Sequence, residues 1–442
     1  MKFLDRWWWP AFIFVYALWV FPIPGLSAGG YPSKLVIGTV WLIVGLLLEW
    51  VSHPHLRLQD LKHLPLALKK HAPVAVALMF GAWTLIASLF SNYPGISFLG
   101  SLADSSDGAI WNAALMLIFC CVYVHCMRNP LLVRRLIGSL ILTGCVLFGL
   151  AIVEFIFKKG FFYSDIRPSD LPLVSFYGKG HLMGIMAMST AVALALWFRG
   201  QRWMILVVFG FMTLIALGFH RAPWLAVLAV IPLGMWRTRA WIPGLVAGVV
   251  IGVSIFLGTQ IGTNAKTGVA RDIRSEASLQ SRSILWKAAF RGILARPLTG
   301  WGGGHFQHYF FQYLTDQELK DGFRIELGYK YRTVLGAGKV NPLFAVTTKD
   351  GQRITLSISL WKAHNQILDV GVMWGIPGII FYIILVFFGI RGSLNLDPLS
   401  IGVLVYQIFL LTWFIPPDAE GMVFAIWGAA AATNVIEKRL SP

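Results

Sequence analysis

Three short polar segments of the sequence carry side chains that could act on an anionic substrate. The first contains His220 and Arg221, the second Arg282, and the third His364. Imidazole can be neutral near pH 7 and can then accept a proton, whereas guanidinium stays charged and binds phosphate oxygens through two hydrogen bonds. We therefore predict that His364 is a general base, and that Arg221 and Arg282 stabilise negative charge developing on a phosphate leaving group.

Further polar side chains near these segments are candidates for substrate binding. We assign this role to Arg274, Arg291, Arg324, Asn365 and His220. We expect no metal ion, because the sequence has no acidic pair and no histidine–carboxylate cluster with the spacing of metal ligands. We also expect no cofactor, because the glycine runs at 300–304 and 336–339 do not complete a nucleotide-binding motif.

Each principal candidate also has a purely structural explanation. His364 could cap the helix that follows it, Arg221 could reach lipid phosphates, and Arg282 could be a solvated helix residue. Asp369 could orient the imidazole of His364, although a spacing of five residues departs from the best helical geometry. These alternatives predict different contacts.

The elements that position these residues belong to a membrane protein. Of the chain, 57% is hydrophobic and only 13% is charged, and the mean hydropathy is +0.69. A soluble domain carries about 25% charged residues. The cysteines lie inside hydrophobic stretches, which excludes a disulfide framework for the polar regions. They are Cys120, Cys121, Cys126 and Cys145.

Hydrophobic stretches of spanning length predict an all-α polytopic fold with about 12 transmembrane helices and one large loop domain between helices nine and ten. We expect helices 1 to 9 in residues 1–259, the loop domain in 260–365, and helices 10 to 12 in 366–442. The predicted spans are 7–26, 33–51, 73–91, 109–127, 136–157, 181–198, 203–219, 222–236, 241–259, 366–389, 398–415 and 422–436.

Basic residues give the orientation of these spans. If the N-terminus is cytoplasmic, the cytoplasmic segments hold sixteen Lys and Arg residues, whereas the short outer connections hold six. Since short cytoplasmic loops retain basic residues, we predict that both termini are cytoplasmic and that the loop domain faces outward. We reject nucleic acid as a partner, because the net charge of +17 largely reflects this asymmetry.

The loop domain is itself basic, with fifteen Lys and Arg residues against seven acids. An anionic ligand or lipid head group is the natural partner of such a surface. Residues 278–295 are predicted to form a helix, followed by the glycine run, whose residues permit close approach of backbones. Two alternating stretches, 344–348 and 354–358, flank an Asp-Gly pair and predict a β-hairpin.

Taken together, the motifs resemble those of the O-antigen ligase and O-antigen polymerase superfamily of bacterial glycosyltransferases. The resemblance covers about residues 92 to 390. This range includes the segment Gly108-Ala109-Ile110-Trp111, which leads into the fourth span. The resemblance depends on the order of four motifs and on the long late loop. The motifs are Arg221 in a short outer connection, Arg282 followed by Trp286, the segment Pro297-Leu298-Thr299-Gly300-Trp301-Gly302, and His364-Asn365 before Gly375-Ile376-Pro377-Gly378. Lys179-Gly180-His181 departs from the asparagine-rich segment expected before the sixth span.

This resemblance implies an enzyme of the bacterial inner membrane, with a periplasmic active site, that takes part in lipopolysaccharide biosynthesis. It would move a glycan from an undecaprenyl-diphosphate carrier to an acceptor hydroxyl, without a metal and with inversion. Lipid A core is the expected acceptor, and a growing glycan in a repeat-unit polymerase is the alternative. A solute transporter is a more distant alternative, since the sequence has no internal repeat and few charges within its spans. A non-catalytic flippase or scaffold is a further alternative, which the concentration of His and Arg residues on one face disfavours.

Overall fold

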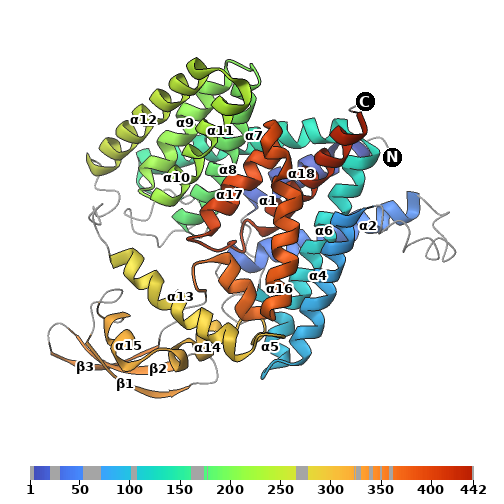
Figure 1. The fold of residues 1–442 in the computed structure, drawn as a ribbon. Coiled ribbons are helices and arrows are strands. Elements are labelled where there is room, and N and C mark those ends of the chain that lie inside the picture. Colours follow the sequence, from blue (N-terminus) through green and yellow to red (C-terminus); the bar gives the residue numbers. More distant parts are fainter. Residues whose placement is uncertain are drawn as a thin grey trace.

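A computed structural model gives the fold of most of the chain. It describes residues 4–19, 30–52, 71–100, 107–160, 174–176, 178–264, 277–322, 324, 330–337, 342–348, 351–357 and 362–440. Within these residues the protein is a bundle of helices with a small mixed domain at one end (Figure 1).

The bundle contains a helix at each predicted span. Its helices are α1 (Leu4–Leu18), α2 (Gly30–Ser52), α4 (Ala72–Leu89), α5 (Pro94–Leu99), α6 (Ala109–Arg128), α7 (Leu131–Phe157), α8 (Lys179–Phe198), α9 (Met204–Leu217), α10 (Arg221–Leu228), α11 (Val230–Thr238), α12 (Trp241–Asn264), α16 (Gln366–Ile390), η6 (Arg391–Asn395), α17 (Pro398–Leu410) and α18 (Glu420–Leu440). Seven helices are long and apolar enough to cross a membrane: α2, α4, α6, α7, α8, α12 and α16. The chain is therefore a helical polytopic membrane protein, while the total of about twelve spans stays a prediction.

Two predicted spans differ from the helices observed. The span at 222–236 is divided into α10 and α11 around Ala229. Pro232 explains the division, because it has no N–H group to bond the carbonyl of Leu228. The span at 398–415 ends as a helix at Leu410, and residues 411–419 are irregular.

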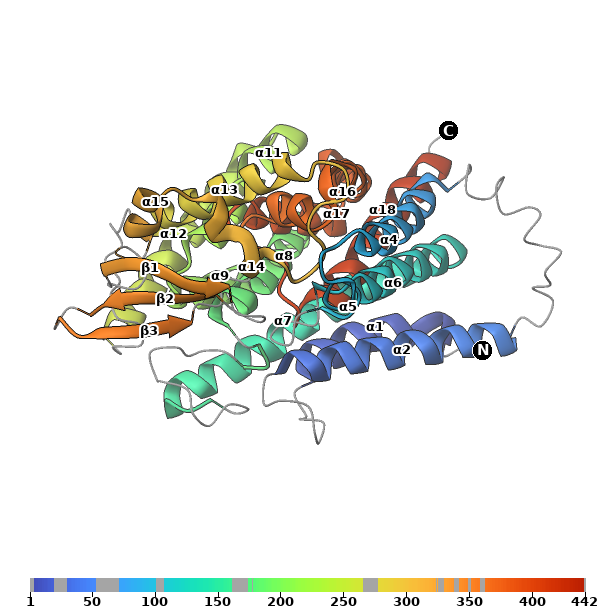
Figure 2. The same cartoon turned by 90° about the horizontal axis from the view of Figure 1, so that it is seen from below.

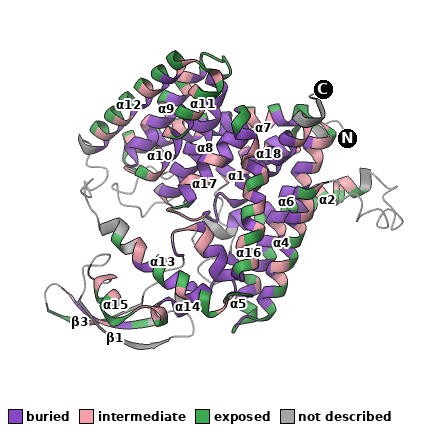
Figure 3. Ribbon diagram, in the orientation of Figure 1, coloured by how far each residue is buried: buried purple, intermediate pink, exposed green. Residues whose placement is uncertain are grey.

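Burial separates the inner from the outer helices. In α8, 94% of the apolar window is buried, whereas the fraction is 22% in α2 and 28% in α12 (Figure 3). Helix α8 packs against α9 and α17, and α6 packs against α4 and α18. A helix that is apolar on every side suits this central position, and the exposed apolar faces of α2 and α12 suit contact with lipid.

Residues 277–357 contain the mixed domain, which we call the insertion. Its elements are α13 (Ala277–Ala295), α14 (Phe306–Tyr309), η4 (Phe310–Tyr313), α15 (Asp316–Gly322), β1 (Lys330–Ala337), β2 (Pro342–Thr347) and β3 (Arg353–Ser357). The strands form an antiparallel sheet in the order β1-β2-β3, at the far end from the chain termini (Figure 2). The pairing of β2 with β3 confirms the predicted hairpin. Strand β1 was not predicted, so the all-α description holds for the bundle but not for the insertion.

The insertion has an apolar core of its own, which joins the bundle at α16. Leu285 and Ile293 of α13, Phe310 of η4 and Phe344 of β2 are buried together with Val372 of α16. Helix α13 therefore lies between the bundle and the sheet, as Figure 1 shows. We call the end of the bundle that carries the insertion the insertion side.

The glycine-rich segment after α13 packs into a break in α16. Helical geometry is lost at Trp374 and Gly375, where Gly375 has φ 70° and ψ −170°. The freed backbone groups bond to the segment: Trp301 N donates to Val372 O (2.8 Å), and Ile376 N donates to Pro297 O (2.7 Å). The two glycine motifs thus bring two backbones together, because a Cβ on Gly375 would lie 2.3 Å from the carbonyl oxygen of Leu298.

Candidate functional site

The candidate site is built around Trp413 and Phe414, in the irregular segment 411–419 between α17 and α18. Their rings are stacked, with centroids 5.6 Å apart and planes 9° apart. The prolines at 416 and 417 prevent a helix from running through the end of this segment, since proline has no N–H group and disfavours helical geometry in the residue before it.

Hydrogen bonds from several helices hold this segment in place. Asn365 Nδ2 donates to Leu411 O (2.9 Å), and Ile415 N donates to the side chain of Gln366 (2.8 Å). At the other end, Tyr16 Oη donates to Pro417 O (3.0 Å) and Lys34 Nζ donates to Asp418 O (3.3 Å). Irregular backbone in the interior of a bundle needs such partners for its polar groups, which the surrounding helices provide here.

The turn before α16 places His364 against this aromatic pair. Its imidazole centroid lies 5.1 Å from that of Trp413 and 5.3 Å from that of Phe414. The backbone of His364 is left-handed, with φ 56°, which few non-glycine residues adopt. Such strained residues persist only where neighbouring contacts hold them, and they cluster at functional sites.

The neighbours of His364 fix this turn. The side chain of Lys362 forms an ion pair with Asp107, and Ala363 N donates to Asp369 Oδ1 (2.6 Å). Asn365 caps α16, because its side-chain oxygen accepts hydrogen bonds from the amides of Ile367 and Leu368 (both 3.1 Å). The capping role considered for His364 therefore belongs to Asn365.

His364 itself keeps one ring nitrogen available. Nδ1 is buried and has no hydrogen-bond partner among the described residues. Asp369 therefore orients the turn through the backbone of Ala363, and the structure gives no bond from Asp369 to the imidazole. A buried nitrogen without a partner is costly, so its lone pair or proton suits a group supplied by a ligand.

Burial is the largest of the causes that lower the pKa of His364 to about 4, and the charges of Arg282, His181 and Lys362 contribute less. The imidazole is therefore neutral at physiological pH, as a base must be, although a pKa this low makes it a weak base until an anion binds nearby.

Two of the other predicted residues contact Trp413 directly. The guanidinium carbon of Arg282, on α13, lies 5.6 Å from the Trp413 ring centroid, and the His220 ring lies 5.8 Å from it. An aromatic face orients a planar guanidinium through a cation–π contact, and a guanidinium is suited to bind an anion. The three segments singled out in the sequence therefore meet at one tryptophan.

Arg221 is the first residue of α10, next to His220. Its side chain is exposed and makes no hydrogen bond or ion pair with the rest of the described chain. The turn before it contains Phe219, which is left-handed with φ 56°, like His364. Arg221 therefore follows His220 directly in the chain and has no counter-ion among the described residues.

His181, which was not predicted, also faces the aromatic pair. Its ring lies 6.5 Å from Trp413 and 5.8 Å from Phe414, and its Nδ1 lies 3.1 Å from Asp418 Oδ2. A carboxylate at Nδ1 fixes the orientation of an imidazole ring. The site thus holds a second histidine whose ring is held by a buried acid.

A buried polar layer lies behind the turn at 362–365. A cavity of about 20 Å³, with room for roughly one water molecule, is lined by Lys362, Asp107, Gln366 and Glu420 among others. Glu420 accepts a hydrogen bond from Trp111 Nε1 (2.6 Å). These contacts tie the starts of α6, α16 and α18 together under His364.

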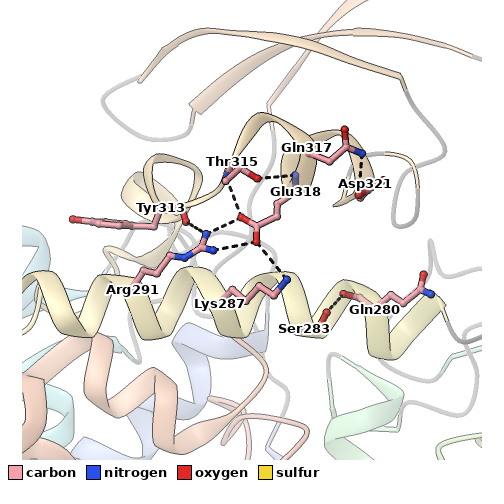
Figure 4. Close-up of polar contacts among 9 residues, drawn as sticks. All are labelled: Gln280, Ser283, Lys287, Arg291, Tyr313, Thr315, Gln317, Glu318 and Asp321. Carbon is pink, nitrogen blue, oxygen red and sulfur yellow. Dashed lines mark hydrogen bonds and ion pairs between the residues drawn. The ribbon is translucent and has the colours of Figure 1, made fainter.

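Arg291 and Arg324, two of the remaining predicted binding residues, do not join this cluster. Arg291 forms a two-pronged ion pair with Glu318 (2.7 and 3.2 Å) and bonds Tyr313 O (2.7 Å), which ties α13 to α15 (Figure 4). Arg291 and Lys287 lower the pKa of Glu318 to about 2, with the Arg291 hydrogen bond as the largest cause. Arg324 pairs with Asp321 (3.0 Å) on the surface of the insertion, and Arg274 lies outside the described residues.

The predicted span 398–415 includes Trp413 and Phe414, because the segment is apolar. A signal in the sequence that could have placed these residues outside a helix is the pair of prolines followed by Asp418, which is typical of an interrupted helix. Across the described part of the chain, no group of three or more His, Cys, Asp and Glu side chains is arranged to hold a metal ion. A scan of protein-family models and a search of curated proteins found no match to this chain.

Proposed function

We propose that this protein is a glycosyltransferase of the bacterial inner membrane, which transfers a glycan from undecaprenyl diphosphate to an acceptor hydroxyl. One observation carries the proposal: Arg282, His220 and His364 surround Trp413, while Nδ1 of His364 has no partner among the described residues. Cations beside an available imidazole suit a reaction with an anionic leaving group and a hydroxyl nucleophile.

In this reaction His364 removes the proton from the acceptor hydroxyl. The oxygen then attacks the anomeric carbon from the face opposite the diphosphate, a new C–O bond forms, and the bond to the diphosphate breaks with inversion. Arg282 and Arg221 bind the phosphate oxygens, on which negative charge increases as the bond breaks. The proton leaves on the imidazole, and the electron pair leaves on undecaprenyl diphosphate.

Lipid A core is the acceptor that we propose first, and the acceptor end of a growing glycan is the alternative. Both present a hydroxyl to the same donor, so the chemistry of His364 and the arginines is common to the two. In the proposed orientation both termini are cytoplasmic, and the insertion side with its site faces the periplasm.

A transporter is the second candidate, because α16 is interrupted at Trp374 and Gly375 and interrupted helices form transporter sites. In this protein, however, backbone fills the interruption. Trp301 N, Gly302 N and Pro297 O take up the carbonyls of Val372 and Met373 and the amide of Ile376. Those groups are therefore not available to coordinate a solute, and the transferase is the better proposal.

The test is an assay with purified protein, an undecaprenyl-diphosphate glycan, and either lipid A core or no second acceptor. Transfer to lipid A core supports a ligase, and longer lipid-linked glycans without a second acceptor support a polymerase. His364→Ala should reduce the rate about 10²- to 10⁴-fold, the usual contribution of a positioned base. Arg282→Ala should also lose most activity.

Arg324→Ala is the matched control, because Arg324 is a cation of the same insertion that pairs with Asp321 away from Trp413. This variant should keep nearly full activity. Normal transfer by folded His364→Ala protein would rule out His364 as the base. If neither donor and acceptor combination gives a product with the wild-type chain, the transferase proposal is wrong.

A further inference from the structure

Helix α13 has an exposed apolar stripe that no other part of the described chain covers. Its inner face is buried through Leu285 and Ile293. On the opposite side, Phe290 is 56% exposed, Leu294 is 60% exposed and Leu298, just after the helix, is 71% exposed. Phe290 and Leu294 are four residues apart and so lie on one face of the helix, and Leu298 is exposed in the turn that follows; we call the three side chains the strip.

The strip continues into an exposed stripe on α16. Ile376 (43% exposed), Ile380 (51%), Ile383 (49%) and Phe387 (57%) follow at helical spacing on that helix. The hydrogen bond from Ile376 N to Pro297 O (2.7 Å) joins the two stripes at the break in α16. Since α16 is one of the helices suited to cross the membrane, its exposed stripe faces acyl chains.

The polar end of the same strip is Lys287, one turn before Phe290. Its side chain is 56% exposed and lies 3.4 Å from Glu318. Polarity along the strip therefore falls from Lys287 through Phe290 and Leu294 to Leu298. A lysine at the shallow end of an apolar strip is typical of a helix that enters the head-group region obliquely.

We propose that α13 is an interfacial helix that lies on the membrane and inserts Phe290, Leu294 and Leu298 among the acyl chains of the leaflet on the insertion side. We identify lipid as the partner of the strip because the strip meets the exposed apolar stripe of α16 where Ile376 N bonds Pro297 O. Acyl chains that surround α16 would therefore also contact α13. This inference goes beyond the proposed transfer reaction and does not depend on it.

The proposal predicts an order of depths: the side chains should lie deeper in the membrane from Lys287 towards Leu298. Arg282 lies about two turns before Phe290 on the same helix. It is then held near the level of the lipid head groups, where the diphosphate of a lipid-linked molecule would also lie.

Nitroxide labels on single cysteines in the full chain test this. The native cysteines are replaced by alanine, and the labelled protein is reconstituted into phosphatidylethanolamine–phosphatidylglycerol vesicles. Labels are placed one at a time through Lys287→Cys, Phe290→Cys, Leu294→Cys and Leu298→Cys. Ile380→Cys serves as the hydrocarbon reference, and Gln317→Cys on α15 serves as the water reference. Collisions with oxygen and with a water-soluble nickel chelate are then measured by power saturation.

We expect the oxygen-to-nickel ratio to rise in the order 287, 290, 294 and 298, and to approach the value at 380. At 294 and 298 it should exceed the value at 317 several-fold. Ratios at 294 and 298 equal to that at 317 would show a solvated helix and overturn the proposal. Labels shielded from both reagents would also overturn it, because they would show that protein, such as a second copy of the chain, covers the strip.

Discussion

His364 combines a strained backbone, a half-buried imidazole whose Nδ1 is enclosed, and a turn in which its neighbours are held by other elements. Lys362 is tied to α6 through Asp107, and Asn365 is tied to α16 and to Leu411. This arrangement fixes the position of the ring without giving Nδ1 a partner. The low pKa follows from the same burial, so position and protonation state have one cause.

The pKa of about 4 predicts an unusual pH dependence for the free protein. Because the neutral imidazole is the active form, activity falls as pH drops through the pKa and is fully present well above it. At limiting donor, kcat/KM should therefore be nearly the same at pH 5.5 as at pH 7. An ordinary histidine with a pKa near 6.5 would keep only about a tenth of its neutral form at pH 5.5.

Donor binding changes this value, because the diphosphate brings negative charge beside an imidazole that faces Arg282. The pKa of His364 should rise in the complex, so kcat at saturating donor should decline at a higher pH than kcat/KM does. The measurement is a pair of pH–rate profiles, with Arg324→Ala as a control that should reproduce both. Loss of half of kcat/KM near pH 6.5 would contradict the assignment.

The sequence was sufficient to select most of the polar residues of the site but not the residue that brings them together. His220, Arg282 and His364 stand out because imidazole and guanidinium groups in polar segments suit chemistry on an anionic substrate. Trp413 does not, since an aromatic residue at the end of a span has the usual position for a membrane interface. The roles of Arg291 and Arg324 depend on Glu318 and Asp321, contacts between separate turns or helices that no motif records.

At the scale of elements, the interruption of α16 is the feature that positions the insertion. Gly375 lies in a backbone region that is essentially restricted to glycine, and Gly300 in the partner segment has φ 66°. The loop at 297–302 and the break in α16 are thus complementary, and each supplies the other's missing hydrogen bonds.

Gly375→Ala should therefore destabilise the protein. The added methyl would lie 2.3 Å from Leu298 O, and the backbone strain alone is about 1–3 kcal/mol. Thermal unfolding in detergent should begin at a lower temperature. Hydrogen exchange should speed up at the amides of Trp301 and Gly302, which bond Val372 and Met373.

Gly248→Ala in α12 is the control, because a Cβ there meets no atom within 4 Å. Alanine favours a helix over glycine by up to about 1 kcal/mol, so this variant should be unchanged or slightly stabilised. Equal unfolding temperatures for the two variants would show that the break does not require glycine.

Element positions were predictable where apolar stretches are long and uninterrupted, as in α4, α6 and α12. The division of the eighth span at Ala229, the early end of α17 and the break at Gly375 were not predicted, although proline or glycine marks each of them. Proline and glycine allow a helix to be interrupted but do not require it. Tertiary contacts determine whether and where the helix is interrupted. Strand β1 was missed, and its pairing with β2 is irregular, with two shifts in register.

At the scale of the molecule, the insertion lies at a single end of the helical bundle (Figure 1). The excess of basic residues predicts that this end is periplasmic. The connection between α8 and α9, which contains the exposed Gln201, should then be cytoplasmic.

Cysteine labelling tests this orientation. Asp316→Cys, on the exposed surface of α15, should react with a membrane-impermeant thiol reagent in intact spheroplasts, and Gln201→Cys should react only after permeabilisation. The parent chain, whose Cys145 is exposed on α7, sets the background. Labelling of Gln201→Cys alone in intact spheroplasts would reverse the orientation and place the site in the cytoplasm.

The pairing of residues 297–302 with α16 also has a consequence for how the chain is made. Synthesis begins at the N-terminus, so this loop is complete before α16 leaves the ribosome. Pro377 has no N–H group, so it leaves the carbonyl of Met373 without a helical partner from the start. The amide of Gly302, which bonds that carbonyl in the folded protein, has already been synthesised when α16 emerges. The loop can therefore complete the hydrogen bonds of α16 as soon as this helix is in place.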